Sequence, residues 1–269
     1  MIVSRGLSFS YPGGRKILSD IDFHIGKGES VALLGANGSG KSTLLGLVST
    51  LLTVTDGSLS VAGIEGKSER RRREIRRHIA YVFQNPDACF LSDTVLEDAV
   101  FTPINYGYSD KDAEKMALIS LERYGMLDKK DRLIDTLSGG EKERAILSSI
   151  SALEKDIYIF DEVLTFLDEN ARNVMLSLIR ELQDEGKTII FVTHSPDDAL
   201  DFDKTMLLSN GRIVAFDRSE DVLRNTDLLR SAGMRLCKAT LVAEDLEKRG
   251  IHLPCIPVRK EELCSLLGM

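Results

Sequence analysis

A glycine-rich segment near the N-terminus carries residue types that bind phosphate. Residues 35–43 read Gly-Ala-Asn-Gly-Ser-Gly-Lys-Ser-Thr, after the apolar run 31–34 and before the helical run 44–48. Between a strand and a helix, GxxxxGK followed by Ser or Thr forms a concavity whose N–H groups face phosphate oxygens. A loop with an incidental lysine is the alternative, and the agreement of pattern with context argues against it.

The residues of this loop have distinct expected roles. Lys41 would reach the β- and γ-phosphates, and the hydroxyl of Ser42 would bind Mg²⁺. The predicted nucleotide-binding residues here are Gly35, Asn37, Gly38, Ser39, Gly40, Lys41, Ser42 and Thr43.

Two acids follow another apolar run, 157–160. Ligands of an open parallel sheet sit outside the carboxyl ends of its strands, so we expect Asp161 and Glu162 on the same edge as Lys41. Asp161 would hold hydrated Mg²⁺, and Glu162 would orient and deprotonate the attacking water. Capping of the next helix is an alternative that suits one of these acids but not both.

A histidine follows a third apolar run, 188–193, and precedes a predicted helix start. There Ser195 is the expected N-cap, Pro196 the first helical residue, and Asp198 stands in capping-box register. The imidazole of His194 would hydrogen-bond a γ-phosphate, and this position favours function over a solvated histidine.

A second glycine-containing segment, Leu-Ser-Gly-Gly-Glu at 137–141, precedes a helix that we expect to begin near Lys142. Ser138 and the amides of Gly139 and Gly140 make it a second anion-ready helix N-terminus. The chain already has one phosphate loop, so a second anion-binding segment makes little sense within a single subunit. We therefore expect this segment to serve a neighbouring subunit.

The elements around these motifs predict an α/β fold. Apolar runs alternate with helical patterns, which favours parallel strands at 30–34, 79–83, 157–160 and 188–192. Residues 3–11 and 21–25 alternate with period two, as antiparallel strands do, and Asn210-Gly211 predicts a hairpin. Helical periodicity at 109–124 and beyond residue 217 predicts a helical subdomain and a helical C-terminal extension.

Composition excludes several classes of protein. The 269 residues are 43% hydrophobic, which is enough for a large core. The net charge of −7 means that the surface lacks the positive electrostatic field of a typical nucleic-acid-binding protein. No secretory signal and no run near the roughly 18 apolar residues of a spanning helix are visible. The cysteines lack zinc-ligand spacing, so we expect reduced thiols in a cytosolic protein.

An arginine-rich run at 67–78 is open to two interpretations. It could bind nucleic acid or lipid headgroups. Glu69 and Glu74 interrupt it, so we favour a solvated helix face.

These motifs, in this order, make the sequence similar to the ATPase subunits of ABC transporters over essentially its full length. The matched positions are the phosphate loop 35–43, the Q-loop glutamine Gln84, the signature 137–141, the Walker B acids Asp161 and Glu162, the D-loop aspartate Asp168 and the switch histidine His194. The resemblance implies a P-loop NTPase fold of ABC type that hydrolyses ATP with Mg²⁺, with Gln84 serving both hydrolysis and the metal site. It further implies an ATPase domain at 1–218, with the helical subdomain at about 88–150, and the extension at 219–269.

The same resemblance implies a head-to-tail dimer with a second ATPase subunit, identical or paralogous. Each ATP would be clamped between one phosphate loop and the other subunit's signature, so that Ser138 and Gly140 act in trans. Gly139 and Asp168 would also belong to this nucleotide site.

Tyr11 matches the aromatic residue that stacks on adenine in this family. It also shares strand parity with Leu7 and Phe9, so a role in the core stays open.

Within the family, 81–87 and 9–14 are similar to the energy-coupling factor branch, which imports vitamins or transition-metal ions. This implies a peripheral subunit at the cytoplasmic face of the membrane, bound to a transmembrane coupling subunit and a substrate-capturing membrane protein. An ATPase of another ABC transporter class, a soluble ABC ATPase acting on ribosomes or DNA, and a clamp without turnover are the alternatives. The segment 163–168 departs from the family pattern, and Glu141 and Glu143 stand where glutamines are common.

Overall fold

The structure, a computed structural model, describes residues 1–83, 89–165, 167 and 169–268. These residues form two compact units, the first made of Met1–Ile75 with Ile190–Met269 and the second of Arg76–Ile189. Within the described ranges, no helix has the length and apolar character needed to cross a membrane.

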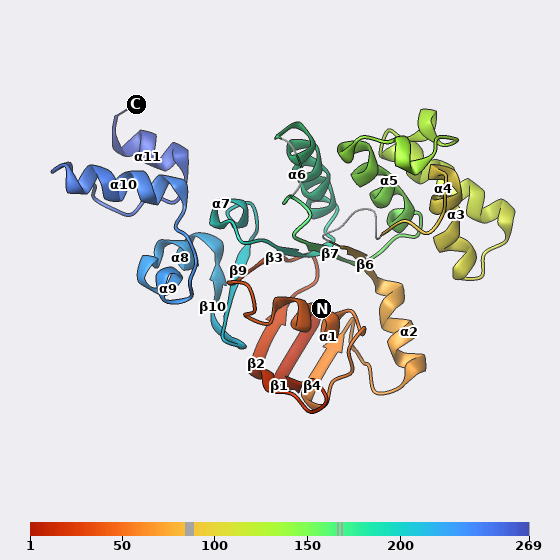
Figure 1. Cartoon of the computed structure of the whole chain (residues 1–269), viewed down its shortest axis with the longest axis horizontal. Coiled ribbons are helices and arrows are strands. Elements are labelled where there is room, and N and C mark those ends of the chain that lie inside the picture. Colours follow the sequence, from red (N-terminus) through yellow and green to blue (C-terminus); the bar gives the residue numbers. More distant parts are fainter. Residues whose placement is uncertain (84–88, 166, 168, 269) are drawn as a thin grey trace. The chain divides into compact units, whose positions relative to one another are not determined.

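The first unit contains an antiparallel sheet with the strand order β2-β1-β4-β5 (Figure 1). The strands are β1 (Ile2–Ser10), β2 (Lys16–Ile25), β4 (Asp56–Val61) and β5 (Ile64–Glu65). In β2 the alternate residues Ile21, Phe23 and Ile25 are buried, as the period-two pattern of 21–25 predicts. β1 agrees with the predicted strand 3–11 to within one residue at each end. β2 contains the predicted run 21–25 but begins earlier, at Lys16. β4 and β5 carry no clear pattern in the sequence.

A second set of strands in the first unit surrounds β3 (Ser30–Leu34), whose residues are all buried. β9 (Lys204–Ser209) is parallel to β3, and β10 (Arg212–Arg218) is antiparallel to β9. On the other side of β3 lies β8 (Thr188–Val192), which belongs to this unit from Ile190 onward. The helices α1 (Lys41–Val48) and α7 (Pro196–Ala199) follow β3 and β8 in the chain.

Short helices complete the first unit after β10. They are α8 (Ser219–Arg224), α9 (Thr226–Ser231), α10 (Lys238–Lys248) and α11 (Lys260–Leu266). Ion pairs tie the last helix, α11, to α8: Arg259 Nε, at the N-cap of α11, lies 2.9 Å from Glu220, and Arg224 lies 2.8 Å from Glu262. The C-terminal segment is therefore helical, as the sequence predicts.

The second unit combines two parallel strands with helices. β6 (Ile79–Val82) pairs with β7 (Ile157–Asp161), and α6 (Glu169–Asp184) follows β7 in the chain. Figure 1 shows α3 (Val95–Asn105), α4 (Asp110–Arg123) and α5 (Gly139–Ser151) gathered together. Apolar side chains from these three helices share one core with the short 3-10 turn η3 (Ile134–Thr136), and η2 (Leu127–Lys129) precedes it.

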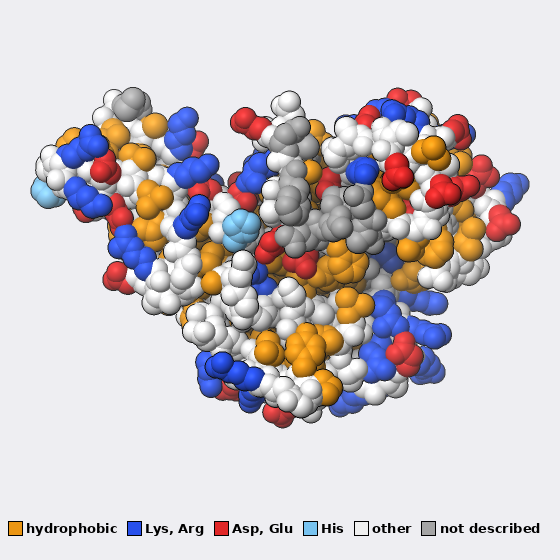
Figure 2. Space-filling view, viewed as in Figure 1, with side chains coloured by type: hydrophobic (Ala, Val, Ile, Leu, Met, Phe, Trp, Pro, Cys, Tyr) orange, Lys and Arg blue, Asp and Glu red, His pale blue; other side chains and the backbone are white. Residues whose placement is uncertain are grey.

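The arginine-rich run forms the helix α2 (Glu69–His78), and Ile75 is its buried residue. Glu69 forms ion pairs with Arg72 and Arg73 on the same helix. Figure 2 shows basic side chains gathered over this helix, facing solvent. These contacts agree with the solvated helix face favoured from the sequence.

Candidate active site

The glycine loop between β3 and α1 is shaped by residues that tolerate no side chain. A Cβ atom on Gly35 would lie 2.4 Å from the carbonyl oxygen of Leu208 and 2.6 Å from Ser39 Oγ. Gly40, the N-cap of α1, has a φ of 109°, which L residues rarely adopt. The backbone can therefore close into a tight loop at the carboxyl end of β3.

Lys41 is folded over this loop. Its Nζ donates hydrogen bonds to the carbonyl oxygens of Gly35, at 2.7 Å, and Ala36, at 3.2 Å, and the residue is buried. The loop thus holds the ammonium group above its own concavity, where it would meet a phosphate.

The N-terminus of α1 is open to an anion. No side chain caps it, and its first turn contains no acidic residue. Ser39 Oγ in the same loop is buried and has no hydrogen-bond partner among the described residues. A helix N-terminus without a side-chain cap, together with an unsatisfied hydroxyl, fits a bound phosphate group.

Two further predicted residues lie beside the loop. Ser42 is exposed in the first turn of α1, and the Oγ1 of Thr43 lies 3.4 Å from the hydroxyl of Tyr11. The Tyr11 side chain is 44% exposed and contacts the ring of Phe9 edge-on, with centroids 5.1 Å apart. Since Phe9 and Leu7 are buried and Tyr11 is not, Tyr11 stands outside the core, and adenine stacking stays a prediction.

His194 lies at the carboxyl end of β8, next to the end of β3. The N–H of Thr193 donates to the carbonyl oxygen of Leu33, which joins the two strand ends. The Thr193 hydroxyl accepts a bond from Ser195 N–H and donates to the Asp198 carboxylate. Ser195 is the N-cap of α7, as predicted, but its side chain forms no capping bond, and the Asp198 carboxylate, expected in capping-box register, accepts from Thr193. This small network fixes the backbone on which the exposed His194 stands.

In the second unit, Asp161 ends β7 and Glu162 follows it. The hydroxyl of Tyr81, on the paired strand β6, donates to Asp161 Oδ2 at 2.8 Å. Burial and the neighbouring carboxylate raise the pKa of Tyr81, so the phenol remains a donor. Glu162 has a φ of 52°, a left-handed conformation that is strained for a residue with a side chain and clusters at functional sites.

The signature segment begins the helix α5 earlier than the sequence analysis expected. The helix starts at Gly139, with Ser138 as its N-cap, and not near Lys142. Glu141 is the reason, because its carboxylate accepts a bond of 2.7 Å from Ser138 N–H and stabilises the first turn. Ser138 and Gly139 remain exposed.

Glu141 and Glu143 are residues whose structural roles sequence reasoning missed. Glu141 also pairs with Lys129 at 2.8 Å, and these bonds lower its pKa to about 2. Glu143 is buried, and its Oε2 has no partner in the described part of the chain, so burial raises its pKa to about 7. The Ser-x-x-Glu spacing predicts the first role, and the helical spacing of Glu143 from buried Ile146 could have indicated the second.

The predicted site residues fall into two groups. Tyr11, the phosphate loop and His194 belong to the first unit, while Asp161, Glu162 and Ser138 to Gly140 belong to the second. Gln84, Asp168 and Phe166 of the atypical segment lie outside the described residues, although Val163 and Leu164 before them are buried.

A glycine loop between a buried strand and an uncapped helix, with a lysine folded over it, defines an α/β ATPase of the P-loop class. The family model described as ABC transporter matches residues 18–165 of this chain. The chain belongs to the ABC transporter family, and ATP is its nucleotide.

Curated relatives resemble the chain over most of its length. The cobalt import ATP-binding protein CbiO of Syntrophus aciditrophicus is 37% identical, over 98% of this chain and 95% of that protein. The energy-coupling factor transporter ATP-binding protein EcfA1 of Fusobacterium nucleatum is 39% identical, over 79% of this chain and 80% of that protein.

Solved structures resemble the fold as well. The cbiO1 protein from Clostridium perfringens, described as part of the ABC transporter complex cbiONQ, has a TM-score of 0.77 at 28% identity, covering 87% of this chain and 95% of that one. The ATP-binding cassette MJ0796, a dimer bound to ADP and Pi, has a TM-score of 0.71 at 25% identity, covering 81% and 99%.

Proposed function

We propose that this chain is the ATP-hydrolysing subunit of a membrane importer of the energy-coupling factor type, whose cargo is a micronutrient such as a vitamin or transition-metal ion. The observation that carries the proposal is the similarity over 98% of the chain to a cobalt import ATP-binding protein. The open phosphate loop supplies the chemistry that such a subunit needs. In this proposal residues 1–218 form the ATPase domain, with a helical subdomain at about 88–150, and residues 219–269 an extension.

The phosphate loop would grip the triphosphate in the first step. The N–H groups at the start of α1 donate to phosphate oxygens, and Lys41 turns from the Gly35 carbonyl towards the β- and γ-phosphates. Tyr11, exposed beside Thr43, stacks on the adenine ring.

Mg²⁺ fits the donor groups that the chain offers. Mg²⁺ takes oxygen ligands, and the exposed hydroxyl of Ser42 and the carboxylate of Asp161 are such ligands. The Tyr81 hydroxyl holds one Asp161 oxygen, which fixes the orientation of the carboxylate. Held there, Mg²⁺ would neutralise charge on the phosphates. Gln84 is proposed as a further ligand by family resemblance.

Hydrolysis itself is assigned to Glu162 and His194. Glu162 orients the attacking water and accepts its proton, and its left-handed backbone, of a kind that clusters at functional sites, supports this role. His194 donates a hydrogen bond to the γ-phosphate from its fixed place after β8.

The working unit is a head-to-tail dimer, in which a second ATPase subunit, identical or paralogous, contributes its signature. Ser138, Gly139 and Gly140 of one subunit contact the ATP held by the other, and Asp168 lies at the same seam. The exposure of Ser138 and Gly139 and the dimeric state of the MJ0796 cassette support this arrangement. Closure of the dimer on ATP drives a transmembrane coupling subunit, which works with a substrate-capturing membrane protein, at the cytoplasmic face of the membrane.

Substitution of the proposed base tests the enzymatic part. Glu162→Gln is expected to lower ATP turnover at least about 100-fold, because the amide cannot accept a proton, and to leave ATP binding intact. Glu181→Gln, an exposed position on α6, is the matched control. If Glu162→Gln and the wild type released phosphate from ATP at the same rate, Glu162 would not be the base. That result would favour the alternative of a clamp that binds ATP without turnover.

Native purification tests the transport part. Mass spectrometry of the complex from membranes is expected to identify a second ATPase subunit and membrane-spanning companions, with turnover stimulated by them. A chain recovered only free of membranes would overturn the proposed transport role.

A further inference from the structure

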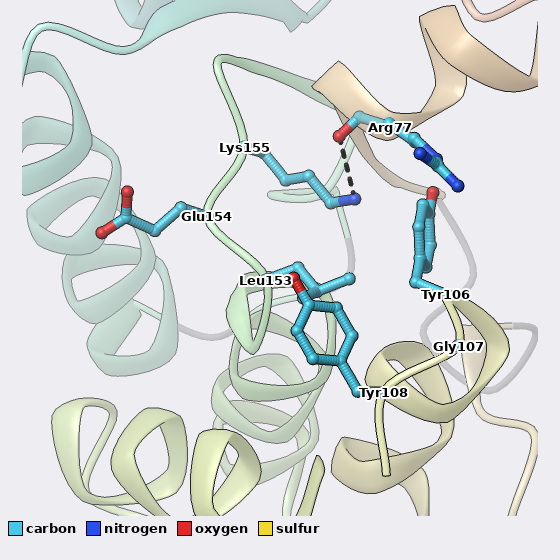
Figure 3. Close-up of a pocket in the computed structure, with 7 residues that line it drawn as sticks. All are labelled: Arg77, Tyr106, Gly107, Tyr108, Leu153, Glu154 and Lys155. Atoms are coloured by element: carbon cyan, nitrogen blue, oxygen red, sulfur yellow. Dashed lines mark hydrogen bonds between the residues drawn. The ribbon is translucent and has the colours of Figure 1, made fainter. Parts of the chain in front are cut away.

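The second unit contains an open pocket of about 320 Å³ that none of the proposed nucleotide-site residues lines. It lies where the end of α2, the turn between α3 and α4 and the turn after α5 meet (Figure 3). Its lining residues are Arg77, Tyr106, Gly107, Tyr108, Leu153, Glu154 and Lys155. The volume is within the range of small-molecule sites.

Lys155 is the most unusual residue of this pocket, because it is an ammonium group on a residue that is 4% exposed. Its Nζ donates one hydrogen bond, to the carbonyl oxygen of Arg77 at 3.1 Å, and lies 4.4 Å from the ring centroid of Tyr106. An ammonium group has three donors, so two form no hydrogen bond to an acceptor oxygen or nitrogen among the described residues. A buried donor without a partner costs free energy, which a bound acceptor would recover.

A second cation stands close to the first. The guanidinium carbon of Arg77 lies 5.8 Å from the same Tyr106 ring centroid. Burial, and then the charge of Arg77, lower the pKa of Lys155 to about 8, so the two cations destabilise each other. An anion between them would reverse this repulsion.

No acid of the pocket compensates these charges. In the ranges that the structure describes, no carboxylate forms an ion pair with Arg77 or Lys155. Asp156 is engaged by His78, with 2.6 Å between Oδ2 and Nδ1. Glu154 lines the pocket, but Figure 3 shows its carboxylate pointing away from Lys155, Arg77 and Tyr106.

We propose that this pocket binds a phosphate group, held by the guanidinium of Arg77 and the ammonium of Lys155. A dianion matches the two cations in charge, and its oxygens accept from the fork of Arg77 and the unfilled donors of Lys155. Tyr106 holds both cations through its ring face. This site is independent of the phosphate loop and of the proposed transport function.

A titration with inorganic phosphate tests the site directly. The chain is labelled with ¹³C at the lysine ε carbons and saturated with Mg·ADP, so that the phosphate loop is occupied. The Lys155 signal is identified by its loss in Lys155→Gln, with Lys115→Gln, exposed on α4, as the matched control. Phosphate is expected to shift this signal saturably in the millimolar range and to raise the pKa of Lys155, whereas chloride at equal ionic strength does neither. Identical behaviour of the signal in phosphate and in chloride would overturn the proposal.

Variants then assign the ligand groups. Arg77→Gln is expected to weaken phosphate binding about tenfold, as loss of a charge-assisted bond does, while Arg70→Gln on the exposed face of α2 leaves it unchanged. Equal weakening by both variants would show a diffuse surface field and would overturn the site. The wild-type titration holds as a test even if Arg77→Gln does not fold.

Two sources could supply the phosphate group, and flotation with vesicles separates them. Vesicles containing phosphatidic acid that retain the wild type but not Arg77→Gln would identify a lipid headgroup as the ligand. Phosphate binding without vesicle retention would identify a soluble phosphate. Either result supports the pocket, and the absence of both would contradict it.

Discussion

The helices α1 and α5 both begin at glycine-containing loops, but their N-termini are completed in opposite ways. At α1, Gly40 supplies no capping side chain and the first turn has no acid. At α5, Glu141 accepts from Ser138 N–H and pairs with Lys129. The N-terminus of α1 is left without a cap, whereas Glu141 stabilises the first turn of α5 and leaves Ser138 and Gly139 exposed. The comparison teaches that the signature holds its shape through its own side chains, whereas the end of α1 is the one that we propose a phosphate completes.

The largest expected effect is that of removing the lysine at the open end. Lys41→Ala should lower ATP turnover about 1,000-fold, because no other described side chain of the loop carries a positive charge to the phosphates. Steady-state release of phosphate measures it, with Lys115→Ala as control. If the turnover of Lys41→Ala stayed within a few-fold of the wild type, the phosphate loop before α1 would not be the catalytic site.

Adding one methyl group to each loop compares them directly. Gly35→Ala should weaken ATP binding about 100-fold, since its Cβ would lie 2.4 Å from the Leu208 carbonyl oxygen. A Cβ on Gly139 would have nothing within 4 Å, so Gly139→Ala should leave thermal stability nearly unchanged. Binding of a fluorescent ATP analogue is measured for Gly35→Ala, and melting curves are measured for both variants. A fall in melting temperature for Gly139→Ala as large as that for Gly35→Ala would refute the contrast.

The buried carboxyl of α5 makes the stability of the second unit depend on pH. Glu143 ionises at its ordinary pKa of 4.5 when unfolded but at about 7 when folded, so the unfolded state releases its proton first. The stability that this group contributes is fully present below pH 4.5 and is lost as pH rises towards about 7.

Glu143→Gln should therefore flatten this part of the pH dependence by about 2 kcal/mol. Urea unfolding at pH 5 and pH 8 checks it, with Glu122→Gln, exposed on α4, as the control. A variant with the wild-type pH dependence would show that this carboxyl is already ionised in the fold.

The smallest expected effect is that of removing the carboxylate that stabilises the N-terminus of α5. Glu141→Ala removes the bond to Ser138 N–H and the pair with Lys129, and should cost about 1 kcal/mol of unfolding free energy. Because the folded pKa of Glu141 is lowered to about 2, the loss should appear at neutral pH and fade as pH falls below 4.5 towards about 2. An unchanged melting temperature at pH 7 would mean that α5 needs no cap.

Local patterns account for most of what the sequence predicted correctly. β3 and β8 have the predicted bounds, because buried runs of five apolar and small residues between turns have few other conformations. The helix α4 begins after Ser109, the residue that the periodic pattern starts from. The predicted start of α5 near Lys142 is wrong, although the Ser-x-x-Glu spacing at 138–141 is a sequence signal for the earlier start.

The sequence by itself determined the phosphate loop, because its glycines, lysine and helix start are neighbours along the chain and act through backbone geometry. Only the tertiary structure decided the surroundings of single charges: which carboxyl is buried, as for Glu143, and which cations meet, as for Arg77 and Lys155. Those contacts join segments far apart in the chain. Their energies depend on burial and distance, which no spacing of residues encodes.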